Sequence, residues 1–298
     1  MKRTDTMYKC CNVRRFIRLL ALDSLIFTIC AAFFFIGRIL LSYAGDSPDT
    51  AVRLPVIMYH SVCSRSPAEY SVTPKQLEDD LIWLKSRGYT TVSAAQLCRY
   101  TQGIGSLPER PVMLTLDDGF YNNLSELLPL LEKYDMCAIV SVVGTYTDND
   151  APRDPHLSAY SYLTWEDIAE LYASGRVEIG NHTYAMHSVS GTRKGCTKLP
   201  EETEEQYRQS LGADILLLQQ KMKENIGITP YVFAYPFGAV SRGCTPFLKE
   251  NGFLMTLTCR ELPNYITRDP SCLYGIGRYN RSGLCSTEEF MNMITKED

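Results

Sequence analysis

Two adjacent carboxylates and two closely spaced histidines are the side chains of this 298-residue chain best suited to chemistry. Asp117 and Asp118 closely follow the apolar run 112–114 and precede a glycine. Like charges side by side repel each other, and burying either one unpaired costs several kcal/mol, so a cation or a proton must resolve the conflict. His182 and His187 follow later in the chain. One carboxylate and two imidazoles would form a three-ligand metal site with open positions, leaving the second carboxylate free as a base.

The spacing of the two histidines limits the kind of element that can carry them. An i, i+5 pair on a helix points about 140° apart, at ~100° per residue. On a strand the two side chains would point to opposite faces. We therefore expect His182 and His187 on a turn that follows a short strand, 177–180. The alternatives are one loop histidine with one core histidine, and an ordinary Asp-Asp-Gly turn at Asp117 and Asp118.

Short apolar runs alternate with amphipathic stretches from residue 54 onward, which favours βα units around a mostly parallel sheet. We expect strands at 54–59, 112–116, 137–143, 177–180, 231–234 and 253–257. We expect helices at 73–85, 124–134, 164–175, 201–224 and 246–250, with Thr164 as an N-cap.

The candidate chemical groups share one position relative to these strands. His60, the Asp117–Asp118 pair, His182 and the segment 235–238 all fall at the C-terminal ends of expected strands. That edge is where α/β barrels assemble their active sites. We therefore expect the four groups to lie close together.

The N-terminal part has the composition of a membrane-inserting segment. Residues 16–41 are mostly apolar and follow a cationic stretch, and this asymmetry keeps the N-terminus in the cytoplasm. We expect a cytoplasmic segment, 1–18, a transmembrane signal anchor, 19–41, a stalk, 42–53, and an extracytoplasmic domain, 54–298. The alternative is a signal peptide cleaved near Ala44, which would release a secreted protein. The apolar stretch is longer than the ~7–15 residues of a typical signal-peptide core, which favours the anchor.

Charge and cysteine content narrow the class of protein further. The formal net charge of −4 argues against nucleic acid as a partner. Three of the 11 cysteines lie before residue 42, which leaves eight in the expected extracytoplasmic domain, an even number that permits disulfides. The expected bridge formers are the four last ones, Cys244, Cys259, Cys272 and Cys285.

Three segments resemble a known family. Residues 115–119 (TLDDG), continued by Phe120 and Tyr121, resemble the T-F-D-D-G motif of the polysaccharide deacetylases, the NodB-like carbohydrate esterase family 4. Residues 55–61 and 233–238 are similar to the first strand and the third motif of its poly-N-acetylglucosamine deacetylase branch, whose two histidines are also five residues apart. The resemblance spans residues 54–280. It implies a distorted (β/α) barrel of about seven strands, circularly permuted, after the N-terminal transmembrane helix.

The resemblance also implies a division of roles within the site. Asp118, His182 and His187 would hold a divalent metal, usually zinc, with cobalt, nickel or iron as alternatives. The metal would polarise an acetamide carbonyl and acidify a water molecule, and Asp117 would act as the general base. A backbone N–H near Phe237 would stabilise the oxyanion. The remaining substrate-binding or oxyanion candidates are Tyr235, Pro236, Gly238 and Tyr121.

The chain departs from the commonest family pattern at two points. The late Leu-x-x-His motif that supplies the general acid is absent, because no histidine follows His187. In the resembled branch the first strand supplies the acid, and His60 fits that place; its alternative is a core or loop histidine. No cation stands near Ala234, so Arg278 is the candidate that orients Asp117; its alternative is a structural ion pair.

These expectations combine into one function. We expect metal-dependent hydrolysis of the N-acetyl group of an N-acetylglucosamine-containing extracellular polysaccharide, with release of acetate. The first alternative is the same chemistry on the N-acetylglucosamine of peptidoglycan. The second, of another class, is a non-catalytic glycan-binding protein on the same scaffold. The partners implied are an N-acetylated polysaccharide and, through one helix, the membrane.

Overall fold

A computed structural model describes residues 28–29, 51–64, 67–150, 156–157, 159–190 and 193–296. The chain divides into two units, residues 1–50 and 51–298. Of the first unit only Thr28 and Ile29 are described, and both are helical. The expected anchor at 19–41 otherwise lies outside the described residues, as do the expected segments 1–18 and 42–50. No helix within the described ranges is long and apolar enough to cross a membrane.

A nine-stranded sheet organises the second unit, and every strand pairing in it is parallel. Its order is β14 (Tyr274–Ile276), β12 (Met255–Leu257), β11 (Val232–Ala234), β8 (Val177–Asn181), β7 (Ala138–Val142), β6 (Pro111–Leu116), β2 (Val56–Tyr59) and β15 (Tyr279–Asn280), with β5 (Thr90–Thr91) also on β6. The two end strands of this path, β14 and β15, are not paired with each other in the described part of the chain. The sheet is therefore a curled half-barrel of nine strands, whereas a distorted barrel of about seven strands was expected.

Three smaller strand pairs complete the sheet structure. β1 (Val52–Leu54) is antiparallel to β13 (Asn264–Ile266), and β9 (Val189–Ser190) is antiparallel to β10 (Arg193–Lys194). β3 (Ser61–Val62) is parallel to β4 (Ser71–Val72). Because β1 begins at Val52, the last two positions of the expected stalk belong to a strand of the second unit.

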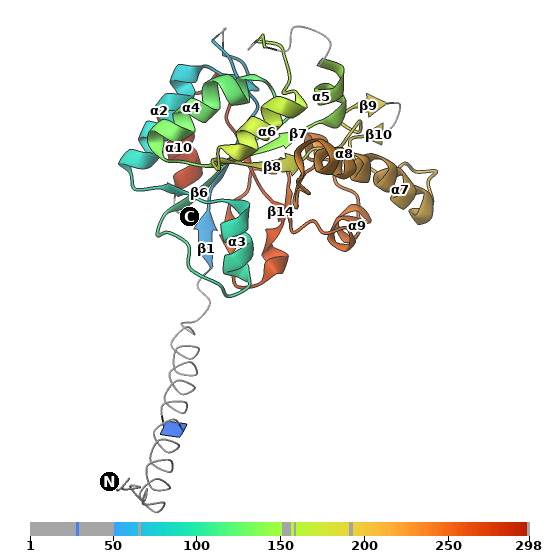
Figure 1. Cartoon of the computed structure of the whole chain (residues 1–298). Helices are drawn as coiled ribbons and strands as arrows, with labels where there is room; N and C mark the ends of the chain where they lie inside the picture. Colours follow the sequence, from blue (N-terminus) through green and yellow to red (C-terminus); the bar gives the residue numbers. More distant parts are fainter. Residues whose placement is uncertain are drawn as a thin grey trace, which may run out of the picture. The chain divides into compact units, whose positions relative to one another are not determined.

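Helices surround the sheet, with α2, α4 and α10 together on one side of it in Figure 1. The α-helices are α2 (Pro74–Ser86), α3 (Ala94–Thr101), α4 (Leu128–Tyr134), α5 (Gly144–Asp150), α6 (Trp165–Ala173), α7 (Glu204–Leu211), α8 (Leu217–Ile226), α9 (Cys244–Glu250) and α10 (Thr287–Thr295). Short 3₁₀ turns lie at Pro236–Gly238 and Pro270–Leu273, and π-helical turns at Asn123–Leu127 and Gly212–Leu216. Helices α2, α4, α6 and α9, and the pair α7 and α8, fall in the five expected ranges, whereas α3, α5 and α10 were not expected.

Local sequence explains where several of these helices begin. Thr164 caps α6 in a capping box with Asp167, as its residue type predicts. Thr73 does the same for α2 with Gln76, and Pro74 occupies the first helical turn, where its missing N–H costs nothing. The single helix expected over 201–224 is instead α7 and α8, joined by the π-helical turn.

The core lies on both faces of the sheet, because successive side chains of a strand point to opposite sides. Ile57 of β2 and Leu114 of β6 belong to a buried cluster shared with α2, α4, α6, α8 and α10. Their neighbours Val56 and Met113 belong to a second cluster, shared with α3, β11, β12 and β14. Residues of both clusters are almost fully buried, which fixes the register of the strands and hence the place of their C-terminal ends.

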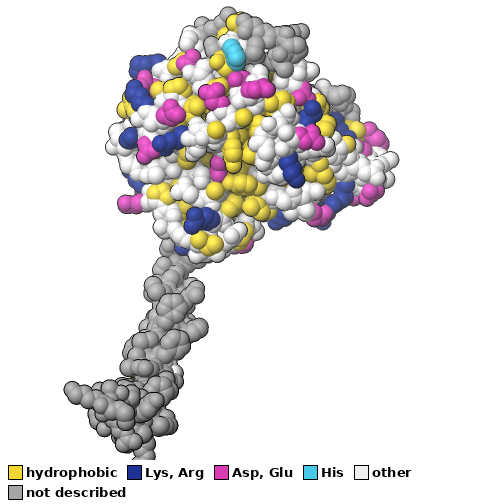
Figure 2. All heavy atoms as spheres, in the orientation of Figure 1, with side chains coloured by type: hydrophobic (Ala, Val, Ile, Leu, Met, Phe, Trp, Pro, Cys, Tyr) yellow, Lys and Arg dark blue, Asp and Glu magenta, His cyan; other side chains and the backbone are white. Residues whose placement is uncertain are grey.

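The state of the cysteines and the distribution of surface charge bear on the earlier expectations. All eight cysteines of the second unit are free thiols, so the expected bridges among the four last ones are not formed in this structure. On the face drawn in Figure 2, acidic and basic side chains are intermixed around a central area of hydrophobic side chains.

Candidate active site

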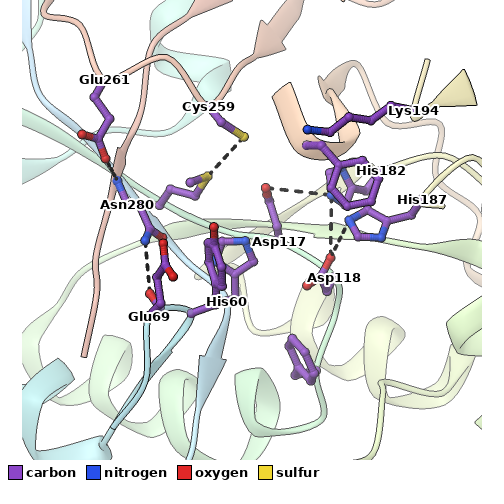
Figure 3. Close-up of a pocket in the computed structure, with 14 residues that line it drawn as sticks. His60, Glu69, Asp117, Asp118, His182, His187, Lys194, Cys259, Glu261 and Asn280 are labelled. Atoms are coloured by element: carbon purple, nitrogen blue, oxygen red, sulfur yellow. Dashed lines mark hydrogen bonds and ion pairs between the residues drawn. The ribbon is translucent and has the colours of Figure 1, made fainter. Parts of the chain in front are cut away.

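A pocket of about 500 Å³ opens at the C-terminal edge of the sheet, where the sequence predicts the site. Asp117 and Asp118 follow β6, His182 follows β8, and His60 follows β2. All four line the pocket together with His187. Figure 3 shows the two aspartates and His182 and His187 pointing toward one another, with His60 beside Asp117. The parallel register of β2, β6, β7 and β8 brings these residues of distant sequence position to one edge.

The two aspartates have different partners. Asp117 is 2% exposed and accepts two hydrogen bonds of 2.7 Å from the guanidinium of Arg278, which is fully buried. Asp118 turns away with a positive φ of 74°, an uncommon conformation for a residue that carries a side chain. Its carboxylate Oδ1 lies 3.2 Å from Nε2 of His187 and 3.7 Å from Nε2 of His182.

The two histidines lie on the loop between β8 and β9, as their spacing predicts. His182 places Nδ1 2.8 Å from the backbone carbonyl of Ala234 in β11. His187 places Nδ1 3.0 Å from the hydroxyl of Tyr146 in α5. Each ring therefore uses Nδ1 against the protein and turns Nε2 toward Asp118.

Arg278 gives the two aspartates different pKa values. Burial works to raise the pKa of Asp117, but Arg278 and His182 lower it, and the net pKa lies well below the ordinary value. Asp118 has no such hydrogen-bonded guanidinium, and burial raises its pKa to about 6. Burial also lowers the pKa of His182 to about 4 and that of His187 below its usual value, which favours neutral imidazoles.

Asp118, His182 and His187 form a group that could hold a metal ion. One ligand atom from each lies within 4.8 Å of the other two. Tetrahedral coordination with bonds of ~2.0–2.2 Å puts ligand atoms roughly 3.3–3.6 Å apart, close to the two distances from Asp118. Oδ1 of Asp118 is buried and has no hydrogen-bond partner among the described residues. A buried carboxylate oxygen without a donor, facing two imidazole nitrogens, fits a divalent cation.

His60 is available for proton transfer. Its Nδ1 is buried without a hydrogen-bond partner in the described part of the chain, and its ring meets Tyr70 edge-on at 5.0 Å. Burial lowers the pKa of His60, while Asp117 and Asp118 act in the opposite direction.

The remaining predicted residues separate into two groups. Phe237 lines the pocket with a positive φ of 58°, and its ring packs 4.6 Å from that of His187. Tyr235 and Gly238 line a different hollow, and Pro236 is buried. Tyr121 also lies away from the pocket, with its ring 4.7 Å from His156. Neither Tyr235, which is buried in a core cluster with Phe233, nor Tyr121 is among the described residues that line the pocket of the aspartates and histidines.

Several pocket residues were not predicted from the sequence. Cys259 closely follows β12, so the rule of strand ends could have identified it. Lys194, Glu69 and Asn280 carry no sequence signal of this kind, because short hairpins and the C-terminal segment bring them to the pocket. In Figure 3, Lys194 lies on the side of the histidines, and Glu69 and Asn280 lie on the opposite side.

Known proteins resemble this chain in sequence. The model of a family described as polysaccharide deacetylase matches residues 104–256, just over half of the chain. A poly-beta-1,6-N-acetyl-D-glucosamine N-deacetylase of Escherichia coli strain K12 is 27% identical over 206 residues, covering 63% of this chain and 31% of that protein. This chain thus spans about a third of the length of that relative. A protein of the same name from Staphylococcus aureus strain MRSA252 is 24% identical over 204 residues, covering 68% of this chain and 66% of that one.

Solved structures resemble it in fold. The de-N-acetylase of Aggregatibacter actinomycetemcomitans matches with a TM-score of 0.66 at 24% identity, covering 82% of this chain and 100% of that one. At this identity the likeness shows a shared fold.

Proposed function

Because the chain belongs to the polysaccharide deacetylase family, we propose that it hydrolyses the N-acetyl groups of an N-acetylglucosamine-containing extracellular polysaccharide and releases acetate. One observation carries this proposal. A metal-competent group, an ionised aspartate and an available histidine line one pocket of about 500 Å³. Amide hydrolysis needs these three functions, an electrophile, a base and an acid, on one substrate bond.

The donor set suits zinc, with cobalt, nickel or iron as alternatives. Two imidazole nitrogens and one carboxylate oxygen are usual ligands of catalytic zinc, and they leave positions open. When bound, such an ion supplies Lewis acidity, which polarises a carbonyl and acidifies a water molecule. Asp118, His182 and His187 would hold it.

Asp117 serves as the general base. Its carboxylate stays ionised at neutral pH because Arg278 donates two hydrogen bonds to it, so it can accept the proton of the attacking water. Arg278 is itself held by Thr258, whose carbonyl accepts from Nε at 2.9 Å. The base is thereby fixed in orientation, which lowers the entropic cost of the proton transfer.

His60 serves as the general acid. The departing glucosamine nitrogen needs a proton as its bond to the acetyl carbon breaks, and His60 lies across the pocket from the metal-competent group. A backbone N–H of the turn at Phe237 stabilises the oxyanion. The products are acetate and a free amine. Asp117 then returns its proton to solvent and His60 regains one from solvent, so both side chains recover their starting protonation states.

The pocket walls suit a sugar polymer. Phe237 is 39% exposed and Tyr70 is 54% exposed at the pocket, so both rings can stack on sugar faces. The polymer we propose is poly-N-acetylglucosamine, since two of the similar proteins carry that substrate in their names. The N-acetylglucosamine of peptidoglycan is the competing substrate.

We further propose a membrane-anchored arrangement, with residues 1–18 cytoplasmic, 19–41 spanning the membrane, a stalk from 42, and the catalytic domain outside. The apolar segment 16–41 and its cationic flank support it. Cleavage near Ala44 is the alternative. We also propose that the barrel is circularly permuted, a reading supported by the parallel pairing of the C-terminal β15 with the N-terminal β2.

An acetate-release assay tests the proposed function. The full chain, reconstituted with zinc, is incubated with poly-N-acetylglucosamine, purified cell wall and chitin oligomers. We expect release from the first substrate, loss of metal binding in Asp118→Asn, and loss of turnover with metal retained in Asp117→Asn. Asp79→Asn, on exposed α2 surface, is the matched control. Release from cell wall alone would favour peptidoglycan, and glycan binding without release at any metal supplement would favour a binding protein.

A further inference from the structure

A tyrosine that no sequence motif identifies contacts one of the histidines of the metal-competent group. Tyr146 lies in α5, the helix that follows β7. Its hydroxyl is 3.0 Å from Nδ1 of His187 and 3.4 Å from the backbone carbonyl of the same residue. On the other side of the ring, Nε2 of His187 is 3.2 Å from Asp118. The two ring nitrogens of His187 therefore have separate partners.

His182 shows what such an arrangement does to an imidazole. Its Nδ1 faces the carbonyl oxygen of Ala234, which can only accept a hydrogen bond. Nδ1 must then carry the hydrogen, and Nε2 presents a lone pair toward Asp118. The protein thus selects the tautomer of His182 that can bind a cation through Nε2.

The phenol of Tyr146 can also support the tautomer of His187 that binds a cation through Nε2, although it does not exclude the other tautomer. A hydroxyl both donates and accepts, so it suits either tautomer of the imidazole. When Nε2 binds a cation, Nδ1 carries the hydrogen and donates it to the phenol oxygen. The phenol hydrogen then has the backbone carbonyl of His187 as its acceptor, so the hydroxyl can accept from the ring and still donate.

We propose that Tyr146 is a positioning residue that holds His187 with Nε2 directed at Asp118 and thereby raises the affinity of the site for a divalent cation. The inference rests on the proposed function, because it takes the group of Asp118, His182 and His187 as the metal site. Hydrogen-bond partners beyond the ligands orient metal-binding histidines, and losing one typically lowers metal affinity about 10- to 100-fold.

The surroundings of Tyr146 are rigid enough for this role. Its ring packs 4.4 Å from that of Tyr162, which stacks on Phe120 at 4.9 Å. Helix α5 is tied down through Asp148, which accepts hydrogen bonds from the indole of Trp165 at 3.0 Å and the hydroxyl of Tyr184 at 2.8 Å. A phenol held on a fixed helix restricts the imidazole at little further entropic cost.

The test compares zinc affinity of the full chain and its Tyr146→Phe variant, measured in detergent by competition with a chromophoric chelator. We expect zinc binding about 10- to 100-fold weaker in the variant. Tyr184→Phe is the matched control, because it removes a hydroxyl that ties the same loop to α5 without touching His187. The visible absorption bands of the cobalt-loaded chain, which report ligand geometry, should change in Tyr146→Phe and stay unchanged in Tyr184→Phe.

Two results would overturn the inference alone: equal zinc affinity of wild type and Tyr146→Phe, or an equal loss in Tyr184→Phe, which would indicate general loosening of α5. Both leave the proposed function standing, since wild type still binds zinc. A wild-type chain that binds no divalent ion would overturn the proposed function and this inference with it.

Discussion

Replacing Arg278 with glutamine would remove the guanidinium that keeps Asp117 ionised. The pair is almost completely buried, with Asp117 2% exposed and Arg278 not exposed. Breaking a buried ion pair by removing one partner leaves an uncompensated charge and costs about 3–5 kcal/mol of folding stability. The same change should also alter the pH dependence of catalysis, which a purely structural pair would not do.

The neighbouring aspartate indicates the size of the second effect. Asp118 is buried in the same pocket without a hydrogen-bonded guanidinium, and burial raises its pKa from the ordinary 3.8 to about 6. Without Arg278, the pKa of Asp117 should rise from well below its ordinary value toward that of Asp118. A rise from 3.8 to about 6 alone corresponds to about 3 kcal/mol. The base is protonated below its pKa, so the activity of Arg278→Gln should be lost as the pH falls through about 6.

The assay is the pH profile of kcat/KM for acetate release, together with urea unfolding. Arg281→Gln is the matched control, because Arg281 and Asp80 form a second fully buried ion pair, 2.7 Å apart, away from the pocket. Both variants should lose similar stability, but only Arg278→Gln should move the acid limb of the profile to higher pH. Coincident acid limbs for wild type and Arg278→Gln would refute the reasoning, as would an equal shift in Arg281→Gln.

Three further outcomes follow from the site. His60→Ala should lower kcat about 10²- to 10⁴-fold with zinc affinity unchanged; an unchanged kcat would exclude His60 as the acid. Dialysis against a chelator should abolish acetate release and zinc should restore it, whereas activity that survives complete metal removal would contradict a metal-dependent reaction. Gly119→Ala should lower the free energy of unfolding by about 1–3 kcal/mol in urea, because φ is +74° and the new Cβ would lie 3.0 Å from Val142. Gly88→Ala, with φ +75° and open space around it, should lose less, and an equal loss would show that contact with Val142 is unimportant.

The candidate site was largely predictable because its main residues follow strands directly in the chain. Asp117, His182 and His60 each come immediately after a strand, and the carboxyl ends of parallel strands meet at one edge of a sheet. The five-residue spacing of the histidines excluded a helix and a straight strand, and both lie on a loop. Local rules likewise predicted the cap of α6 at Thr164, since an N-cap depends on neighbouring residues alone.

The residues that the sequence left undecided depend on contacts between distant segments. Tyr121 follows the Asp117–Asp118 motif and Tyr235 follows an apolar run, yet neither ring lines the pocket. Their direction is set by the packing of helices and turns, which sequence spacing does not record. The same holds for the closure of the barrel, because the pairing of the end strands β14 and β15 depends on the accumulated curl of the whole sheet.

The sequence alone predicted a metal-competent group: adjacent carboxylates need a cation, and two histidines five residues apart on a loop can supply its other ligands. Only the tertiary structure decided how the two aspartates differ. Arg278 lies 161 residues after Asp117, and the pairing of β15 with β2 brings its guanidinium within 2.7 Å of that carboxylate. Tyr146 reaches His187 in the same way, across 41 residues. A pKa and an imidazole tautomer are set by such neighbours in space, and neighbours in space are what a linear sequence leaves open.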